Sequence, residues 1–282
     1  MFLEKAKEII CGGYDLHIHT APSHFPRKLD DFEALKQADD AGIAGILIKS
    51  HYEQTQSRAM MANEHCKTKA QAFGGLALNY PVGGFNPYAV ESFLKAGGRM
   101  VWMPTRDAAH SLRMGDMPGD FFKRKGLSVF DAEGQINQEI LEILDIIKNY
   151  DACVATGHIS LEESLALCQK SLAMGIKTVL THPDWMRTLV TQRIQKELCE
   201  QGVYIEKVFA TIKEKTITQL EMANCLRTLN PRRVIMVTDR GQLNEDYPAL
   251  ELLRFVQAML QEGVSTSTLK EIVRQTPQKL LS

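Results

Sequence analysis

An acid and two histidines near the N-terminus of this 282-residue chain are the first side chains whose types and spacing could do chemistry. The stretch GYDLHIHT, residues 13–20, places Asp15, His17 and His19 at alternate positions of an apolar run. Because successive side chains of a β-strand point to opposite faces, these three share one face. Carboxylate and imidazole groups suit Zn²⁺ and similar divalent cations. We therefore expect the three side chains to point into the mouth of a barrel and to hold a metal ion.

Further polar residues stand at the ends of other short apolar runs. Lys49 and His51 are two apart in GILIKSHY, and three later runs end in His158, His182 and Asp239. Any one of these histidines could be a hydrogen-bonded core residue. Random placement would not put five of the eight histidines at strand ends, because strands contribute a minority of residues. The joint pattern therefore favours a metal site.

The runs that carry these residues alternate with amphipathic segments along the whole chain. Eight apolar runs are typical of strands: 14–20, 45–52, 72–80, 99–105, 152–160, 177–184, 202–209 and 233–239. Seven segments between them are typical of helices: 30–41, 55–69, 86–96, 138–149, 161–174, 188–200 and 216–229. This alternation over about 250 residues predicts an α/β fold, a (β/α)8 TIM barrel, whose site lies at the C-terminal ends of the strands.

One connection is longer than a barrel requires. The stretch 106–137 after the fourth predicted strand exceeds an ordinary βα loop, and its MPGDFFKRKG segment is rich in charge and turn residues. We expect this stretch to be a lid or substrate loop with a small hairpin. Residues after about 246 should form one or two terminal helices. Since no linker or repeat interrupts the chain, residues 1–282 are predicted to be one barrel domain.

The order of these motifs resembles the amidohydrolase superfamily of metal-dependent hydrolases, and its compact members most. DLHIHT, TGHIS, LTHPDW and VTDRG stand where that superfamily has HxH on strand one, single histidines on strands five and six, and an aspartate on strand eight. The resemblance implies that His17 and His19 bind one metal and that His158 and His182 bind a second. It also implies that Asp239 binds a metal, accepts a proton from water as the catalytic base and passes it to the leaving group.

The fourth predicted strand departs from many two-metal members of the superfamily. RMVWMPT has neither the lysine nor the glutamate that bridges two metals in them. Lys49 could supply that bridge if it were carbamylated or had a depressed pKa, because a protonated lysine cannot bind a cation. Lys49 could equally bind a substrate carboxylate or phosphate. His51 is a candidate for binding either metal or substrate.

A second family shares part of this pattern. DLHIHTAPS and IKSHY resemble the first two motifs of the polymerase and histidinol phosphatase family, whose three-metal sites hydrolyse phosphoesters. That family continues its first motif with SDG, where this chain has SHF, and ends its third strand in a glutamate, where Asn79 stands. Its last motif needs Asp-x-His, whereas Asp239 is followed by Arg and Gly. A phosphoesterase is therefore the alternative function.

Three more side chains near predicted strand ends are candidates for substrate binding. Arg106 and Arg240 suit bidentate contacts with carboxylate or phosphate, and would otherwise form salt bridges at the rim. Glu206 could bind substrate, orient a metal-binding imidazole, or pair with Lys207 or Arg240.

Composition limits the partners and the compartment. The net charge of -1 gives no electrostatic case for nucleic acid. No apolar run approaches the roughly 18 residues of a membrane span, and the N-terminal residues lack a signal-peptide core. Six scattered cysteines without a CxxC pair favour a reduced compartment. We expect a cytoplasmic protein that acts on a small-molecule substrate and binds neither nucleic acid nor membranes. The protein could form a homo-oligomer.

Together these features predict a metal-dependent hydrolase. The expected reaction is cleavage of an amide, cyclic amide or ester bond by metal-activated water. One or two divalent ions are expected, with Zn²⁺ first and Mn, Fe, Ni or Co as alternatives. Besides phosphoester hydrolysis, a barrel that binds a metal or ligand without catalysis is the remaining alternative.

Overall fold

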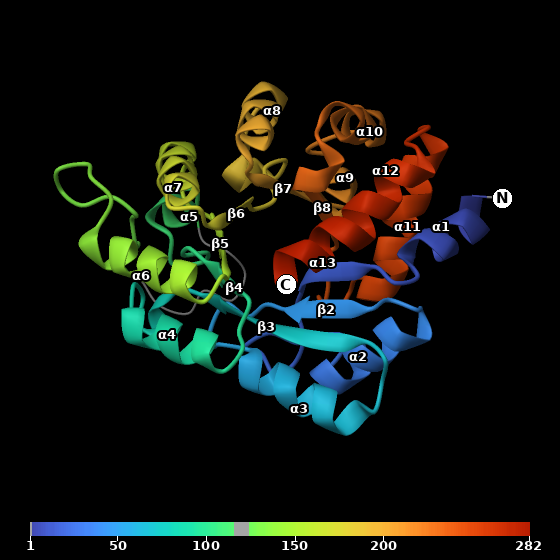
Figure 1. Cartoon of the computed structure of the whole chain (residues 1–282), viewed down its shortest axis with the longest axis horizontal. Coiled ribbons are helices and arrows are strands. Elements are labelled where there is room, and N and C mark those ends of the chain that lie inside the picture. Colours follow the sequence, from blue (N-terminus) through green and yellow to red (C-terminus); the bar gives the residue numbers. More distant parts are fainter. Residues whose placement is uncertain (1, 116–123) are drawn as a thin grey trace.

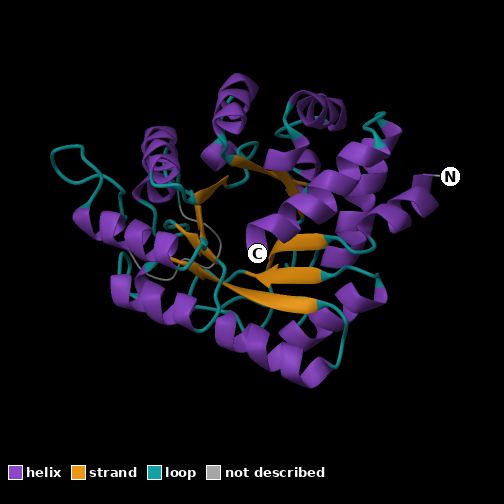
Figure 2. Ribbon diagram, viewed as in Figure 1, coloured by secondary structure: helices purple, strands orange, loops and turns teal. Residues whose placement is uncertain are grey.

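The computed structural model describes residues 2–115 and 124–282 and contains eight strands in one nearly closed barrel (Figure 1, Figure 2). The strands follow one another around the ring in chain order, and each pairs in parallel with the next. All eight predicted strands are confirmed, and the fold is a single-domain (β/α)8 barrel. The strands are β1 (Tyr14–Ile18), β2 (Gly45–Ile48), β3 (Gln71–Ala77), β4 (Met100–Trp102), β5 (Cys153–Ala155), β6 (Lys177–Leu180), β7 (Tyr204–Val208) and β8 (Val234–Val237).

Helices surround the barrel, and all seven helices predicted between the strands are present (Figure 2). An additional helix, α1, packs against α11. None of the helices in the described ranges is long and apolar enough to cross a membrane. The helices are α1 (Phe2–Ile10), α2 (Asp31–Asp40), α3 (Gln56–Cys66), α4 (Pro87–Lys95), α5 (Ala109–Arg113), α6 (Gln138–Asn149), α7 (Leu161–Ala173), α8 (Gln192–Gln201), α9 (Ala210–Lys213), α10 (Gln219–Thr228), α11 (Pro248–Gln261), α12 (Thr266–Lys270) and α13 (Thr276–Leu281), with short helical turns η1 (Tyr80–Val82), η2 (Met186–Thr188), η3 (Pro231–Arg233) and η4 (Glu271–Gln275).

The ring closes between the end of β1 with its next residue and the residues that follow β8. Ile18 forms a parallel bridge with Arg240. The backbone N–H of His19 donates to the carbonyl of Arg240 at 2.7 Å, and the N–H of Asp239 donates to the carbonyl of His17 at 2.9 Å. The first and last motifs of the sequence therefore lie side by side.

The interior of the barrel is filled with apolar side chains, and α13 closes its N-terminal end. Leu280 and Leu281 of α13 belong to the same buried cluster as Leu16 and Trp102 from the strands. The Cys153 thiol at the start of β5 lies 3.1 Å from the Leu280 carbonyl. In Figure 1 the C-terminus accordingly lies at the centre of the ring. This packing leaves the C-terminal ends of the strands as the open end.

Every strand ends earlier than predicted, so several polar residues lie in loops. β5 ends at Ala155 and β6 at Leu180, two or more residues before His158 and His182. His182 has a φ of 27° and Asp239 a φ of 52°, a left-handed conformation that is uncommon outside glycine and concentrates at functional sites. The chain therefore leaves the strand direction where these side chains must turn toward the barrel axis.

The long connection between β4 and α6 contains α5 and is closed at its base. The N–H of Ala109 donates to the carbonyl of Leu127, and the N–H of Leu127 donates to the carbonyl of Asp107, both at 2.7 Å. An antiparallel bridge between Phe130 and Ile136 forms a small hairpin, as predicted. Residues 116–123, which include most of MPGDFFKRKG, lie outside the described residues, so the lid stays a prediction.

Candidate active site

A cavity of ≈ 590 Å³ opens at the C-terminal ends of the strands, a volume suited to a small-molecule ligand. Most of the side chains predicted from the sequence meet there. The predicted residues that line it are His19, Lys49, His51, Arg106, His158, His182, Asp239 and Arg240. Of the three others, His17 and Glu206 have side chains with no solvent exposure (0%) and lie beneath this layer, and Asp15 is described below.

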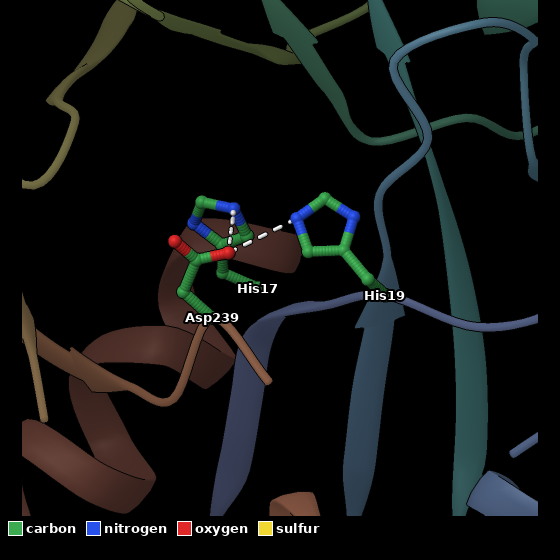
Figure 3. Close-up of side chains that lie close together, drawn as sticks. All are labelled: His17, His19 and Asp239. Carbon is green, nitrogen blue, oxygen red and sulfur yellow. Dashed lines mark ion pairs between the residues drawn. The ribbon is translucent and has the colours of Figure 1, made fainter. Parts of the chain in front are cut away.

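His17, His19 and Asp239 converge on one point of the cavity (Figure 3). Asp239 Oδ1 lies 3.2 Å from His17 Nε2 and 3.0 Å from His19 Nε2. One nitrogen or oxygen atom from each residue lies within 4.8 Å of the other two. One cation could therefore contact all three.

Close backbone packing holds this group together. Gly241, two residues after Asp239, lies against the backbone of His19, and a Cβ on it would stand 1.6 Å from the His19 carbonyl oxygen. No side chain fits in that space, which explains a glycine at this position. The loop after β8 is therefore pressed against the loop after β1, and the aspartate is delivered to the two imidazoles.

Glu206 on β7 fixes the orientation of the His17 ring. Glu206 Oε1 lies 3.1 Å from His17 Nδ1, and both side chains are buried. Burial favours the neutral carboxyl, but the basic neighbours His17, His182 and Lys49, including the hydrogen bond from His17, outweigh it and lower the pKa of Glu206. The carboxylate accepts the proton of Nδ1, which leaves the lone pair of Nε2 directed toward Asp239. Of the alternatives for Glu206, the structure places it against an imidazole and not on the cavity wall.

Replacing Glu206 by glutamine should weaken binding of a divalent cation by about 10- to 100-fold, because the neutral amide no longer polarises the His17 ring. Competition with a fluorescent zinc chelator measures the affinity. Glu214→Gln is the matched control, since Glu214 lines the same cavity and its side chain bonds to Trp185. The control should stay within about twofold of the wild type. Equal affinities in Glu206→Gln and the wild type would contradict the orienting role.

His158 and His182 form a second group across the cavity. Their Nε2 atoms lie 3.2 Å apart, and Trp185 packs against both rings at centroid distances of 5.1 Å. His182 Nδ1 lies 2.9 Å from Thr188 Oγ1, and the Thr188 hydroxyl donates its proton to the His182 carbonyl at 2.8 Å. Because that proton is used, Nδ1–H must donate to Thr188, and Nε2 of His182 carries a lone pair.

Burial disfavours the charged form of four imidazoles of the site. Burial lowers the pKa of His19 to about 3 and that of His182 to about 4. Burial likewise holds the pKa values of His51 and His158 well below the ordinary value. A neutral imidazole is the form that binds a metal ion.

This set of donors fits divalent cations. The lone pair of His17 Nε2 faces the Asp239 carboxylate oxygen at 3.2 Å, and the lone pair of His182 Nε2 faces His158 Nε2 at 3.2 Å. Electron-rich atoms at such distances need a proton or a cation near them, which a divalent ion would supply for both pairs and which Lys49 Nζ, 3.0 Å from His17 Nε2, can supply for the first. His17, His19 and Asp239 would hold one ion, and the expectation that His158 and His182 bind a second stays a prediction.

Lys49 and His51 of the β2 motif lie beside these groups. Lys49 Nζ lies 3.0 Å from His17 Nε2, and burial lowers its pKa to about 8. A lowered pKa makes it easier for Lys49 to lose its proton, which the role of metal bridge requires. The role of cation for a substrate anion requires the protonated form, so both roles of Lys49 stay open. His51 stacks on His19 at a centroid distance of 5.0 Å, and its Nδ1 lies 2.8 Å from Thr105 Oγ1.

Asp15 does not reach the cavity, so the expectation that it holds a metal is wrong. Its carboxylate accepts the Thr238 hydroxyl at 2.6 Å, the Thr238 N–H at 3.1 Å and the His17 N–H at 3.3 Å. The alternation of β1 gives Asp15 the same face as His17, but one layer deeper in the barrel. There it joins β1 to the end of β8.

The arginines of the cavity differ in their partners. Arg240 forms a salt bridge with Glu251, with its Nε 3.1 Å from Glu251 Oε2. This is the salt-bridge alternative given for Arg240, although the residue also lines the cavity. The Arg106 guanidinium lies 4.4 Å from the centroid of the Phe25 ring. Arg27 lines the cavity as well. Sequence analysis missed Arg27, because it follows no strand end and no spacing rule locates it.

Lys207 does not pair with Glu206, because its side chain points to the opposite face of β7. Lys207 Nζ lies 2.8 Å from Asp184 Oδ2 and 2.6 Å from Gln195 Oε1, and it is fully buried. Gln195 in turn donates to Asp184 Oδ1 at 2.9 Å. This network ties the loop that carries His182 to β7 and α8.

Lys207→Met should lower the free energy of unfolding by about 3–5 kcal/mol, because it leaves the Asp184 carboxylate buried without its counter-ion. Urea unfolding followed by circular dichroism measures the change. Lys196→Met on α8 is the control, since Lys196 is exposed and lies 3.9 Å from Glu200; surface changes of this kind stay within about 0.5 kcal/mol. A loss in Lys207→Met no larger than in the control would show that the network contributes nothing.

Comparisons with known proteins agree with this architecture. The model of the family described as "Family of unknown function (DUF6282)" matches residues 12–206. No curated protein matches the sequence significantly. An amidohydrolase from Pseudomonas aeruginosa has a similar structure, with a TM-score of 0.67, 10% identity, and coverage of 99% of this chain and 98% of that one.

Two further solved structures share the fold. A lactonase from Listeria monocytogenes has a TM-score of 0.61 and 11% identity over 97% of this chain and 96% of that one. A 2,6-dihydroxybenzoate decarboxylase from Rhizobium has a TM-score of 0.55 and 12% identity over 96% and 98%. The resemblance to the amidohydrolase superfamily is thereby confirmed at the level of the fold.

Proposed function

This chain belongs to the DUF6282 family, and we propose that it is a metal-dependent hydrolase that cleaves an amide, cyclic amide or ester bond of a small molecule. The observation that carries the proposal is the convergence of His17, His19 and Asp239 within 4.8 Å of one another at the wall of a cavity of ≈ 590 Å³. An amidohydrolase and a lactonase among the proteins of this fold favour hydrolysis. A decarboxylase has the same fold, so the fold alone does not decide the reaction, and the reaction must be tested directly.

The chain's own residues supply ligands and a proton acceptor. A bound divalent cation would provide Lewis acidity, which lowers the pKa of water and polarises a carbonyl. Burial favours the neutral form of Asp239, but His17, His19 and Lys49 outweigh it and hold the pKa of its carboxyl well below the usual value. Asp239 is therefore charged, and its side chain is 28% exposed to the cavity. It can take a proton from water at the carboxylate and return it to the leaving group.

The experiment is a substrate screen with protein loaded with Zn²⁺ or Mn²⁺. We expect turnover of members of an amide, cyclic amide, lactone and ester panel, and none of phosphomonoesters. Turnover of phosphomonoesters alone would replace the proposal by the phosphoesterase alternative. Protein that binds no metal when purified without chelator would favour a barrel without catalysis.

The residue at the end of β3 argues against the phosphoesterase. Where that family would place a ligating glutamate, the Asn79 amide donates to the His51 carbonyl at 2.9 Å and to Thr105 Oγ1 at 2.7 Å. Its oxygen accepts the N–H groups of Thr105 and Asp107 at 2.9 and 3.1 Å. These four bonds use the amide of Asn79 to hold together the loops after β2, β3 and β4, and not to bind a metal.

A further inference from the structure

The segment between β1 and α2 folds back over the cavity and is fastened to the loop that carries Asp239. Ala21 forms a parallel bridge with Asp30, which closes the base of the segment. Arg27 forms an antiparallel bridge with Gln242 after β8. The backbone N–H of Lys28 donates to the Gly241 carbonyl at 2.9 Å. Arg27 is thereby held beside the site by backbone pairing.

A second fastening comes from α3. Arg58 donates to the Ala21 carbonyl at 2.9 Å and to the Pro22 carbonyl at 3.1 Å. Its Nε also lies 2.8 Å from Asp31 Oδ2. Because both ends of the segment are tied, its side chains are positioned before any ligand binds, which lowers the entropic cost of binding.

Two guanidinium groups of the cavity lie against one aromatic ring. Arg106 and Arg27 have their central carbons 4.4 and 5.5 Å from the centroid of the Phe25 ring, and all three residues line the cavity. A cation over an aromatic face is held in place at modest energy. The ring therefore acts as a fixed support for two positive charges at the cavity wall.

Arg27 has no carboxylate partner in the described part of the chain, where no acidic oxygen lies within 4.0 Å of its guanidinium. Its side chain donates one hydrogen bond there, Nε to Ser23 Oγ at 3.4 Å. Arg240 on the same cavity wall, by contrast, is neutralised by Glu251. Arg27 is half-buried, so its charge loses solvation without a carboxylate of the described residues in direct contact.

The charge of Arg27 acts at the proposed metal site. Burial lowers the pKa of Arg27, and Asp239 is the largest influence that opposes this lowering. Arg27, His19 and Asp239 also line the same cavity. An anionic group bound at Arg27 would thus lie within electrostatic reach of the atoms proposed to do the chemistry.

We propose that Arg27 and Arg106 bind a carboxylate of the substrate and so hold its scissile bond at His19 and Asp239. The position of the scissile bond rests on the proposed function, whereas the carboxylate site does not. Arginine suits this role because its planar fork matches a carboxylate with two parallel hydrogen bonds. The enzyme would therefore act on acids such as N-acyl amino acids or the carboxylates of cyclic amides, in preference to their neutral analogues.

The test is a binding measurement with two probes of nearly the same shape, one with a carboxylate and one with a neutral amide in its place. N-benzoylglycine carries the carboxylate, and N-benzoylglycinamide is its neutral counterpart. Quenching of Trp185, which lines the cavity, and calorimetry measure binding to the protein as purified. We expect wild type to bind the acid about 10- to 100-fold more tightly than the amide. Arg27→Met should remove this preference, Arg27→Lys should retain part of it, and the exposed Arg193→Met control should retain all of it.

Each other outcome identifies what fails. Equal binding of both probes, or a preference unchanged in folded Arg27→Met, would overturn the carboxylate site, because the acid would then bind elsewhere or directly to a metal. Tighter, Arg27-dependent binding of inorganic phosphate than of the acid would overturn its assignment to carboxylates. An Arg27-dependent preference in a protein that hydrolyses no panel substrate would leave the carboxylate site standing and reject the proposed function. Hydrolysis of panel substrates without any preference for the acid would support the proposed function and reject the carboxylate site.

Discussion

Asp239→Asn should lower kcat of the metal-loaded enzyme by about 10²- to 10⁴-fold, the usual contribution of a general base. Asparagine has nearly the same shape as aspartate, but its amide cannot take a proton from water. The barrel should stay folded, because the backbone bond from the Asp239 N–H to the His17 carbonyl does not involve the side chain. Steady-state hydrolysis of a substrate from the panel measures kcat, and circular dichroism checks the fold.

Two controls separate the loss of the base from other effects. Asp246→Asn changes an exposed aspartate paired with Arg254 on the surface, and it should have wild-type kcat. Metal content must be measured in Asp239→Asn, because Asp239 is also a proposed ligand, and kcat is compared at saturating metal. A variant that keeps more than about a tenth of the wild-type kcat would mean that another group accepts the proton.

Metal binding should stabilise the barrel strongly. The proposed metal ligands lie in β1 or follow β1, β5, β6 and β8, so bound ions tie together segments that are distant in sequence. At a free Zn²⁺ concentration of about 100 times Kd, the gain in free energy of unfolding should be about 2.7 kcal/mol. Thermal unfolding after chelator treatment, and again after addition of Zn²⁺, measures the difference, and elemental analysis gives the ions per chain.

Single histidine variants assign each ion to its group. His182→Ala should lose the second ion and retain the one at His17, His19 and Asp239, so the content falls from about two ions to about one. His17→Ala should lose the first ion and most of the stabilisation. His65→Ala, on the exposed face of α3, is the control and should match the wild type. If both site variants keep the wild-type metal content and Tm shift, these imidazoles are not the ligands.

Much of the fold follows from local pattern. Each strand is a short apolar run between polar segments, and helix boundaries carry their own signals. Ser160 and Glu163, for example, form a capping box at the start of α7, with bonds of 3.2 and 2.8 Å. The convergence of His158, His182 and Asp239 follows once the barrel is accepted, because all parallel strands of a barrel end on the same side.

The remaining features of the site required the tertiary structure. The two-residue period of β1 puts Asp15 and His17 on one face but does not give their depth, and depth decides that one contacts Thr238 while the other faces Asp239. The period of β7 likewise does not say which neighbour Glu206 contacts.

The sequence by itself determined the eight-stranded barrel and the residue types at its mouth, because both depend on spacing within short segments. The tertiary structure decided that Glu206 orients His17 and that Arg27 lies on the cavity wall. Both depend on contacts between segments far apart in the chain, and these are set by how neighbouring strands are staggered and by which loops fold back over the mouth. No local pattern encodes either.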